Sequence, residues 1–227
     1  MGGVEGLNSG DKGMTPAAQI AGYLFSNDWF NDAVKGVWRE LLAQLAPSRV
    51  LEIGSFEGAS ACFLIQQIAA ARPLELHCVD TWQGGREHQP GSTAAADMKQ
   101  VEARFQANVS TAVRSSQFPV KVEVHRAPSV EVLPKLLCDQ GAGRFDMVYV
   151  DGSHQASDVL WDAVLTFKLL RVGGVIVFDD YLWSDGAPRD VLMAPKIAID
   201  AFTTVYASKV RILSAPLYQL YVVKTAD

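Results

Sequence analysis

Short apolar runs alternate along the chain with segments in which apolar residues recur every three or four positions. The clearest helical segment spans 156–170, where Val159, Ala163 and Phe167 fall on one face of a helix. Three other segments with this character are predicted to be helices: 59–71, 95–112 and, over a shorter stretch, 129–137.

The apolar runs are predicted to be β-strands of a parallel sheet. Several of them, most clearly 145–151 and 173–180, read as continuous apolar runs rich in Val and Ile, which is typical of strands covered on both faces. Regular alternation of strands and helices indicates an α/β fold with three layers, doubly wound. The runs are RVLEIG (49–54), LELHCVD (74–80), VKVEVH (120–125), FDMVYVD (145–151) and GGVIVFDD (173–180).

The end of the chain breaks this rhythm. KVRILSA (209–215) and YQLYVVK (218–224) are separated by only two residues, which is too short for a parallel crossover. We expect them to form an antiparallel hairpin at the edge of a seven-stranded, mostly parallel sheet. Gly173 and Gly174, at the start of the fifth run, are suited to ending the preceding helix.

A single domain is predicted for residues 15–227, because the sequence contains no internal repeat and no low-complexity linker. Within it, 15–47 is expected to form a helical cover over the sheet, with an aromatic group that includes Trp29 and Trp38 packed in the core. Residues 1–14 are glycine-rich and lack the cationic start and apolar centre of a signal peptide, so they are predicted to be a flexible tail.

Composition narrows the class of protein. The chain is 49% hydrophobic and 20% charged, as in a globular protein, and its formal net charge of −5 argues against a nucleic-acid partner. No stretch reaches the roughly 18 apolar residues that a membrane span needs. Cys62, Cys78 and Cys138 lack the spacing of a zinc site or a disulfide framework. A cytoplasmic protein with reduced cysteines and no membrane partner is therefore expected.

The turn after the first predicted strand, LEIGSFEGAS (51–60), has the residues of a nucleoside-cofactor site. Gly54 and Gly58 let the backbone approach a ligand, and the helix N-terminus that follows favours a carboxylate. Asp80 ends the second strand, where an acid can accept both hydroxyls of a ribose. The spacing from Glu52 is ExGxxxG and not GxGxxG, which favours a cofactor with a carboxylate and a ribose but no pyrophosphate.

Three aspartates, called the acidic trio below, end the fourth and fifth predicted strands. Asp151 follows the fourth strand, and Asp179 and Asp180 close the fifth, so all three are expected at the crevice that holds the cofactor turn. Converging carboxylates repel one another unless a proton or cation intervenes, and a hard ion such as Mg²⁺ suits them. His154 can accept a proton near neutral pH. In the alternative, the aspartates cap loops or helices, and His154 caps a helix, ligates the ion or contacts the substrate.

With these motifs and the terminal hairpin, residues 35–226 resemble the class I S-adenosylmethionine-dependent methyltransferases, which have a Rossmann-like fold. The resemblance implies that the first turn holds the methionine part of S-adenosylmethionine, that Asp80 holds the ribose, and that residues after the third strand lie by the adenine. The cofactor contacts that it implies are Glu52, Gly54, Ser55, Phe56, Gly58, Ser60, Asp80, Thr81, Trp82, Ala127, Pro128, Ser129 and Asp151.

The acidic trio resembles the magnesium site of catechol O-methyltransferase, and its Asp-Asp pair resembles that of the macrocin type of sugar O-methyltransferase. Asp180 stands where the catechol enzyme has asparagine. His154 stands where the catechol enzyme has a base lysine and the macrocin type has histidine. The resemblance implies Mg²⁺ on Asp151, Asp179 and Asp180, with His154 and Asp151 as catalytic residues. The implied reaction is O-methylation of a small-molecule hydroxyl on a sugar, diol or phenol.

Three other functions are compatible with parts of this pattern. A metal-free N- or C-methyltransferase would use the cofactor turn without the trio, an NAD-dependent dehydrogenase would need a GxGxxG turn, and a binding module would keep the fold alone. The loops 81–98 and 181–190 are candidate rims of the site. Their candidate ligand contacts are Trp82, His88, Tyr181, Trp183 and Arg189. The sequence leaves the acceptor and the oligomeric state open, with the hairpin and the N-terminal helices as candidate contact surfaces of a homo-oligomer.

Overall fold

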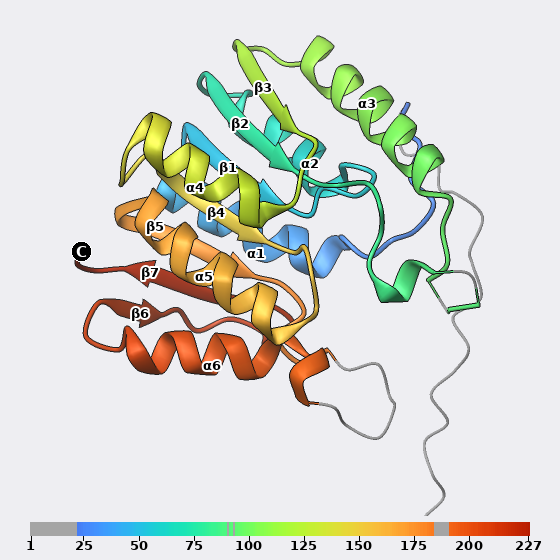
Figure 1. Ribbon diagram of the computed structural model, residues 1–227. Coiled ribbons are helices and arrows are strands. Elements are labelled where there is room, and N and C mark those ends of the chain that lie inside the picture. The colour runs from blue at the N-terminus through green and yellow to red at the C-terminus, as the bar shows by residue number, and fades with distance from the viewer. Residues whose placement is uncertain (1–21, 90, 93, 184–190) are drawn as a thin grey trace, which may run out of the picture.

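A seven-stranded sheet runs through the computed structural model, which describes residues 22–89, 91–92, 94–183 and 191–227 (Figure 1). The strand order is β3-β2-β1-β4-β5-β7-β6. Strands β1 to β5 run parallel, and β7 lies antiparallel between β5 and β6, so the predicted mixed sheet with a terminal hairpin is confirmed. The strands are β1 (Arg49–Ile53), β2 (Leu74–Val79), β3 (Val120–His125), β4 (Phe145–Val150), β5 (Leu170–Phe178), β6 (Val210–Ile212) and β7 (Leu220–Lys224).

Helices cover both faces of the sheet and confirm the three layers (Figure 1). Residues of α1, α2 and α3 form a core cluster on one face, and residues of α4, α5 and α6 form one on the other. The helices are α1 (Asp32–Leu45), α2 (Ala59–Ile68), α3 (Met98–Arg114), α4 (Ser129–Gln140), α5 (Ala156–Leu169) and α6 (Pro195–Val205), with the short 3₁₀ helices η1 (Arg86–His88) and η2 (Val191–Met193).

Parts of the sequence predictions lie outside the described residues. These are the tail at 1–14, the start of the helical cover at 15–21, and positions 90, 93 and 184–190 of the two candidate rim loops, with Arg189 among them. Within the described part of the predicted cover, α1 is the helix, and an irregular segment precedes it. None of the helices that the structure describes combines the length and the apolar character needed to cross a membrane.

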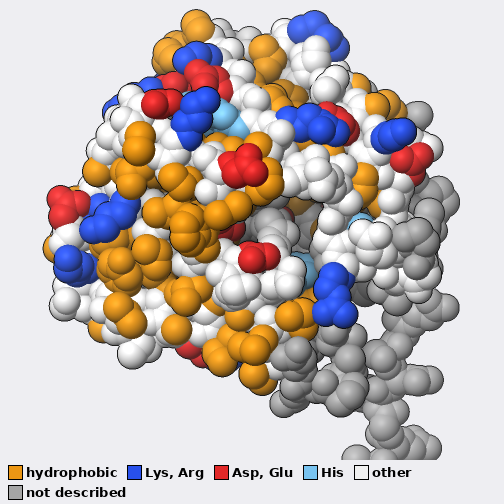
Figure 2. Space-filling model, in the orientation of Figure 1, with side chains coloured by type: hydrophobic (Ala, Val, Ile, Leu, Met, Phe, Trp, Pro, Cys, Tyr) orange, Lys and Arg blue, Asp and Glu red, His pale blue; other side chains and the backbone are white. Residues whose placement is uncertain are grey.

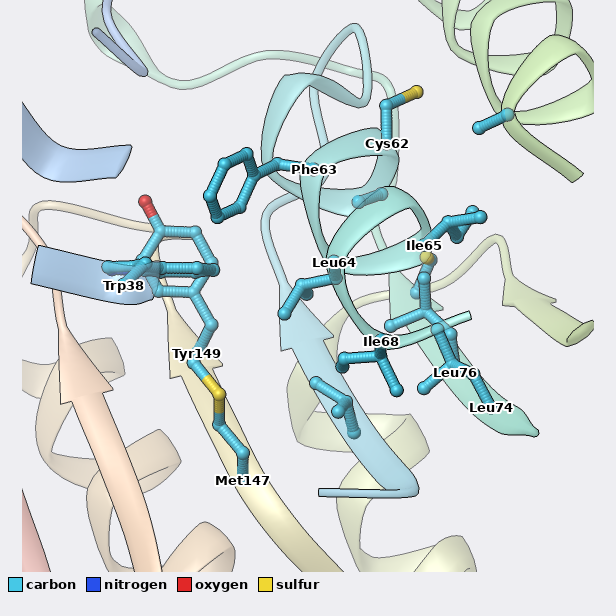
Figure 3. Packing of buried hydrophobic residues seen from close by; sticks show 14 of the residues in the cluster. Trp38, Cys62, Phe63, Leu64, Ile65, Ile68, Leu74, Leu76, Met147 and Tyr149 are labelled. Carbon is cyan, nitrogen blue, oxygen red and sulfur yellow. The ribbon is translucent and has the colours of Figure 1, made fainter. Parts of the chain in front are cut away.

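The α1 helix buries Trp38 against the central strands (Figure 3). The indole packs edge-on against Tyr149 of β4, with ring centroids 4.8 Å apart, and donates from Nε1 to Gln219 Oε1 at 2.7 Å. Phe63 of α2 packs beside it, with ring centroids 6.4 Å apart. The predicted core position is therefore confirmed for Trp38. It is wrong for Trp29, which is 56% exposed.

The start of β5 also differs from the prediction. The α5 helix ends at Leu169 and β5 begins at once, so Gly173 and Gly174 lie inside the strand and do not end the helix. Gly173 has a φ of +78°, and a Cβ on Gly174 would lie 2.8 Å from the carbonyl oxygen of Asp146 on β4. The two glycines therefore permit the irregular register with which β5 begins its pairing to β4.

The central parallel strands end together at one edge of the sheet. Backbone N–H groups beyond the strand ends continue the ladder, from Asp151 to the Ile53 oxygen at 2.8 Å and from Asp179 to the Val150 oxygen at 2.9 Å. The helix after β1 covers one face of the sheet and the helix after β4 covers the other. Connections that leave neighbouring strands toward opposite faces open a crevice between them, and ligands of α/β proteins bind there.

Candidate active site

A cavity of about 1000 Å³ opens at the carboxyl ends of the parallel strands, and Figure 2 shows the surface hollowed at this edge. The loops after β1, β2, β3 and β4 and the first turns of α5 line it. The predicted site residues in its wall are Gly54, Phe56, Asp80, Thr81, Ala127, Pro128, Ser129, Asp151 and His154. The predicted site residues outside its wall are Glu52, Ser55, Gly58, Ser60, Trp82, Asp179 and Asp180.

Two glycines allow the turn after β1 to pack closely against the end of β4 and against α3. Gly54 has a φ of +83°, and a Cβ there would lie 1.9 Å from the backbone oxygen of Asp151. Gly58 has a φ of +81°, and its Cβ would lie 3.0 Å from the ring of Phe105 on α3. These contacts within the chain require glycine, whereas the sequence predicted that both glycines admit a ligand.

Glu52 stabilises the same turn through hydrogen bonds with two of its serines. Its side chain is fully buried and accepts hydrogen bonds from Ser55 Oγ at 2.6 Å and from Ser60 Oγ at 2.5 Å. Burial raises the pKa of Glu52 to about 7, although the two serine hydrogen bonds act in the other direction. The three side chains thus form a buried network that shapes the turn, and their direct contact with a cofactor stays a prediction.

Asp80 ties the loop after β2 to the loop after β1. Its Oδ2 accepts hydrogen bonds from the backbone N–H groups of Ser55 and Phe56, each at 2.9 Å, and its Oδ1 accepts one from Trp82 at 2.7 Å. The Trp82 side chain is buried, donates from Nε1 to the Phe56 carbonyl at 2.9 Å and packs on Phe105. Trp82 therefore supports the loops from beneath, while Asp80 borders the cavity.

The rim of the cavity is built from segments far apart in the sequence. His88 of η1 stacks on Phe56 with ring centroids 5.2 Å apart, and Trp29, which precedes α1, packs on Phe56 at 5.1 Å. Arg86 Nη1 lies 3.0 Å from Met193 Sδ, which links the loop after β2 to η2. The loop after β2 is therefore part of the rim, and Trp29 joins it from a segment that the sequence predicted as core.

Tyr149 connects two members of the acidic trio. Its hydroxyl lies 2.9 Å from Asp151 Oδ2 and makes a still shorter contact with Asp179 Oδ2. Burial, helped by the charges of neighbouring aspartates, raises the pKa of both Asp151 and Asp179. Because a tyrosine hydroxyl has one proton to donate, these carboxyl groups need a further proton or a cation between them. Tyr149 can be found from the sequence, since it precedes Asp151 by two positions and so points to the same side.

Asp180, the third member, turns toward His154. The His154 Nε2 lies 2.9 Å from Asp180 Oδ2, and the imidazole packs on Trp183 with centroids 4.0 Å apart. Asp180 has a φ of +53°, and its backbone N–H donates to Asp179 Oδ1 at 2.8 Å. As described, the trio does not bring one oxygen from each aspartate within 4.8 Å of the other two. The predicted base and one predicted metal ligand are therefore paired with each other.

Asp162 of α5 is a cavity residue that the sequence predictions do not include. Its side chain is 2% exposed, and its Oδ1 has no hydrogen-bond partner among the described residues. Burial raises the pKa of Asp162 to about 7, partly opposed by a hydrogen bond with Ser129. Its signal in the sequence is a carboxylate one helical turn from the buried Val159 and Thr166. Asp162 therefore places a buried carboxyl group in the wall of the cavity, beside Ser129.

Comparison with known proteins finds a family and several relatives. The model of a family described as a methyltransferase domain matches residues 51–181. The O-methyltransferase hkm8 of Aspergillus hancockii is 25% identical over 134 residues, which cover 59% of this chain and 43% of that protein. A catechol O-methyltransferase of Niastella koreensis is 28% identical over 157 residues, which cover 69% of this chain and 59% of that protein. The chain thus matches about half the length of these curated relatives.

Solved structures share the arrangement of helices and strands. The O-methyltransferase TomG of Streptomyces achromogenes, in complex with S-adenosylmethionine, has a TM-score of 0.60 at 20% identity, covering 86% of this chain and 81% of its own. An O-methyltransferase of Bacillus cereus, in complex with S-adenosylhomocysteine, has a TM-score of 0.56 at 17% identity, covering 86% and 82%. These similarities confirm the predicted Rossmann-like fold.

Proposed function

Because the chain belongs to the methyltransferase domain family, we propose that it transfers the methyl group of S-adenosylmethionine to a hydroxyl oxygen of a small molecule, with the help of Mg²⁺. One observation carries this proposal: the cavity that Asp80 and Ser129 line is also lined by Asp151 and His154. Asp80 and Ser129 mark the cofactor end of the cavity, and Asp151 and His154 mark its acceptor end. A cofactor and an acceptor bound at these two ends would lie close together, as a two-substrate transfer needs. The relatives named O-methyltransferase, and the neighbours solved with S-adenosylmethionine or S-adenosylhomocysteine, support the choice of cofactor and acceptor atom.

The cofactor end is assigned to the loops after β1, β2 and β3. S-adenosylmethionine bound there would supply an electrophilic methyl group on its sulfonium. A carboxylate has about four lone-pair sites, and three backbone N–H groups already occupy Asp80. We therefore assign Asp80 one ribose hydroxyl, where the sequence predicted two. Ser129 and Asp162 border the part assigned to adenine.

The acceptor end is assigned to His154 and its neighbours. Asp180 Oδ2 lies 2.9 Å from His154 Nε2, and this contact orients the imidazole. Packing on Trp183 restrains the ring. An imidazole held in this way can take a proton from an acceptor hydroxyl near neutral pH, and a desolvated cavity favours a step that neutralises opposite charges.

The acidic trio has the donor chemistry of a Mg²⁺ site. It offers only carboxylate oxygens, and the raised pKa of Asp151 and of Asp179 reflects burial and repulsion that a cation would offset. Asp151, Asp179 and Asp180 would hold the ion, and the bound ion would act as a Lewis acid on the acceptor oxygen. Ligation by all three requires Asp180 to bring a carboxylate oxygen closer to Asp151 and Asp179 than the structure places it.

A metal-free methyltransferase is the second candidate, and the Asp180–His154 pair favours it. In that case Asp180 keeps the orientation that it has and serves His154 alone. The Tyr149 hydroxyl, with one further proton, would then be enough to hold Asp151 and Asp179 together.

Methyl transfer from labelled S-adenosylmethionine to a panel of catechols, vicinal diols and sugars, followed by mass spectrometry, separates the candidates. We expect O-methylated products with Mg²⁺, and about 100-fold slower turnover after chelation or in Asp179→Asn, because the Lewis acid is lost. His154→Gln should slow turnover by a similar factor, since the base is lost. Asp139→Asn, at an exposed position of α4, is the control. Turnover that resists chelation would favour the metal-free enzyme, and products methylated on nitrogen or carbon would contradict the oxygen acceptor.

A further inference from the structure

A second group of metal-type ligands lies outside the cavity, at the β2–β3 edge of the sheet. His77 of β2 is paired in register with Glu123 of β3, and His125 follows Glu123 by two positions and so shares its face. One donor atom from each of the three side chains lies within 4.8 Å of the other two. None of the three lines the cavity, and the proposed methyl transfer uses none of them.

The distances between the donor atoms suit a tetrahedral ion. His77 Nδ1 lies 3.0 Å from His125 Nε2 and 3.9 Å from Glu123 Oε2. Ligand atoms bound to zinc at about 2.0–2.1 Å are roughly 3.3 Å apart, a spacing that these two distances bracket. Two imidazoles and a carboxylate also make up the donor set of open zinc sites, which keep a fourth position for water. We propose that His77, Glu123 and His125 bind a divalent transition-metal ion of the zinc type.

The surroundings of His77 orient it as a ligand. Its Nε2 lies 3.3 Å from Glu75 Oε1, and a proton held there by the carboxylate would leave the Nδ1 lone pair facing His125 and Glu123. Arg144 Nη2 in turn holds Glu75 Oε2 at 2.5 Å. A carboxylate on the outer nitrogen is the partner that zinc-bound histidines usually have. Glu75 and Arg144 therefore orient the ligand His77 through hydrogen bonds.

Neighbouring side chains also position the other two ligands, Glu123 and His125. Lys121 pairs with Glu123 Oε1, so that Oε2 is the oxygen nearest His77. His125 presents its Nε2 to His77 Nδ1 at 3.0 Å. Glu123 is 33% exposed in its side chain while His77 is fully buried, so an ion can enter from the solvent side of β3. Figure 2 shows histidine beside acidic and basic side chains over this part of the sheet.

This site and the acidic trio are expected to bind different metal ions. Imidazole nitrogen favours Zn²⁺, Co²⁺, Ni²⁺ or Cu²⁺, whereas the carboxylates of the trio suit Mg²⁺. The site also reaches the cavity through the backbone, because the His125 carbonyl accepts hydrogen bonds from Asp80 N–H at 3.2 Å and Ala127 N–H at 3.0 Å. An ion on His125 would therefore stiffen the end of β3, next to two residues of the cavity wall.

Titration of metal-stripped protein with Co²⁺, followed by visible absorption and then by displacement with Zn²⁺, tests this proposal. We expect one Co²⁺ per chain with the intense absorption of a tetrahedral site, and its loss on adding Zn²⁺. His125→Asn and Glu123→Gln should each abolish the spectrum. Glu75→Gln should weaken binding by about 10–100-fold, because it acts through His77. His88→Asn, a histidine of the loop after β2, is the matched control and should leave the spectrum unchanged.

Three results would overturn the assignment. They are the absence of a tetrahedral spectrum in the wild type, a spectrum that persists in both His125→Asn and Glu123→Gln, and a spectrum lost in Asp179→Asn, which would assign the ion to the acidic trio. Thermal unfolding without metal establishes that each variant is folded. Because Glu123 is partly exposed, Glu123→Gln keeps the test decisive if His125→Asn does not fold. The methyltransferase proposal is untouched by each of these results except the last.

Discussion

Buried carboxyl groups set the charge of the cavity and its surroundings. Burial raises the pKa of Glu52 and of Asp162 to about 7, and it also raises the pKa of Asp151 and of Asp179. Each group therefore favours its protonated form well above the pH at which an exposed carboxyl ionises. The cavity is less negative near neutral pH than its residue types suggest. A rise in pH, or the binding of a cation, would favour ionisation of these carboxyl groups and make the protein part of the cavity more negative.

Asp162→Asn should alter how stability depends on pH. The pKa of Asp162 is raised from its ordinary value of 3.8 to about 7, so the stability that its protonated form contributes is complete below pH 3.8 and is lost as pH rises to about 7. Asparagine cannot ionise and avoids this loss. We expect the unfolding free energy of the variant, relative to the wild type, to rise across that window by on the order of a few kcal/mol and then stay constant.

Urea unfolding at a series of pH values measures this difference. Asp139→Asn, at an exposed position of α4, is the control, and its difference from the wild type should stay constant with pH. Parallel pH curves for wild type and Asp162→Asn would show that Asp162 is not forced toward its neutral form.

At the scale of helices and strands, most of the fold could be predicted from the sequence. Continuous apolar runs indicated the parallel strands, and the two residues between the last runs left room only for a hairpin. The α6 helix was not predicted, although Pro195 at its first position and the buried Ala198, Ile199 and Phe202 are ordinary helix signals. Gly173 was wrongly predicted to end the preceding helix. Its left-handed conformation belongs to the irregular start of β5, and that irregularity depends on pairing with β4.

The candidate site could be predicted in position but not in orientation. The strand-end residues Asp80, Asp151 and His154 do line one cavity, because parallel strands end at the same edge. Glu52 does not line that cavity, because hydroxyl groups of the turn that follows it bind its carboxylate. Asp180 turns to His154, a contact between loops distant in the sequence. Such side-chain directions follow from tertiary packing, which periodicity does not encode.

Gly54→Ala should separate the ends of β1 and β4. The new Cβ would lie 1.9 Å from the Asp151 carbonyl oxygen, and the φ of +83° disfavours any residue with a Cβ. We expect a loss of about 2–4 kcal/mol in unfolding free energy, from overpacking together with backbone strain. Urea denaturation measures this loss.

Gly36→Ala in α1 is the matched control, because its Cβ would meet nothing within 4 Å. It should stabilise the protein by about 0.5–1 kcal/mol, since alanine is the better helix former. If Gly54→Ala unfolds at the same urea concentration as the wild type, the close contact between the two strand ends is not a constraint on this turn.

In the whole molecule, the strand order places different chemistry at different parts of one sheet. The cofactor turn and the acidic trio meet around β1, β4 and β5, where connections leave toward opposite faces. The group of His77, Glu123 and His125 lies at the β2–β3 edge, with nitrogen donors in place of the oxygen donors of the trio. Measurements on the two sites can therefore be kept apart by the choice of metal, and cofactor binding can be measured with a chelator present.

Calorimetric titration of S-adenosylhomocysteine into the chelator-treated protein tests the central claim, that the cavity is a methyltransferase cofactor site. We predict binding of one molecule per chain in the wild type and in Asp139→Asn. Binding to Asp80→Asn should be about 10–100-fold weaker, because a hydrogen bond to a charged group is lost. Thermal unfolding establishes that this variant is folded. Absence of binding to the wild type, or equal binding to wild type and folded Asp80→Asn, would contradict the account.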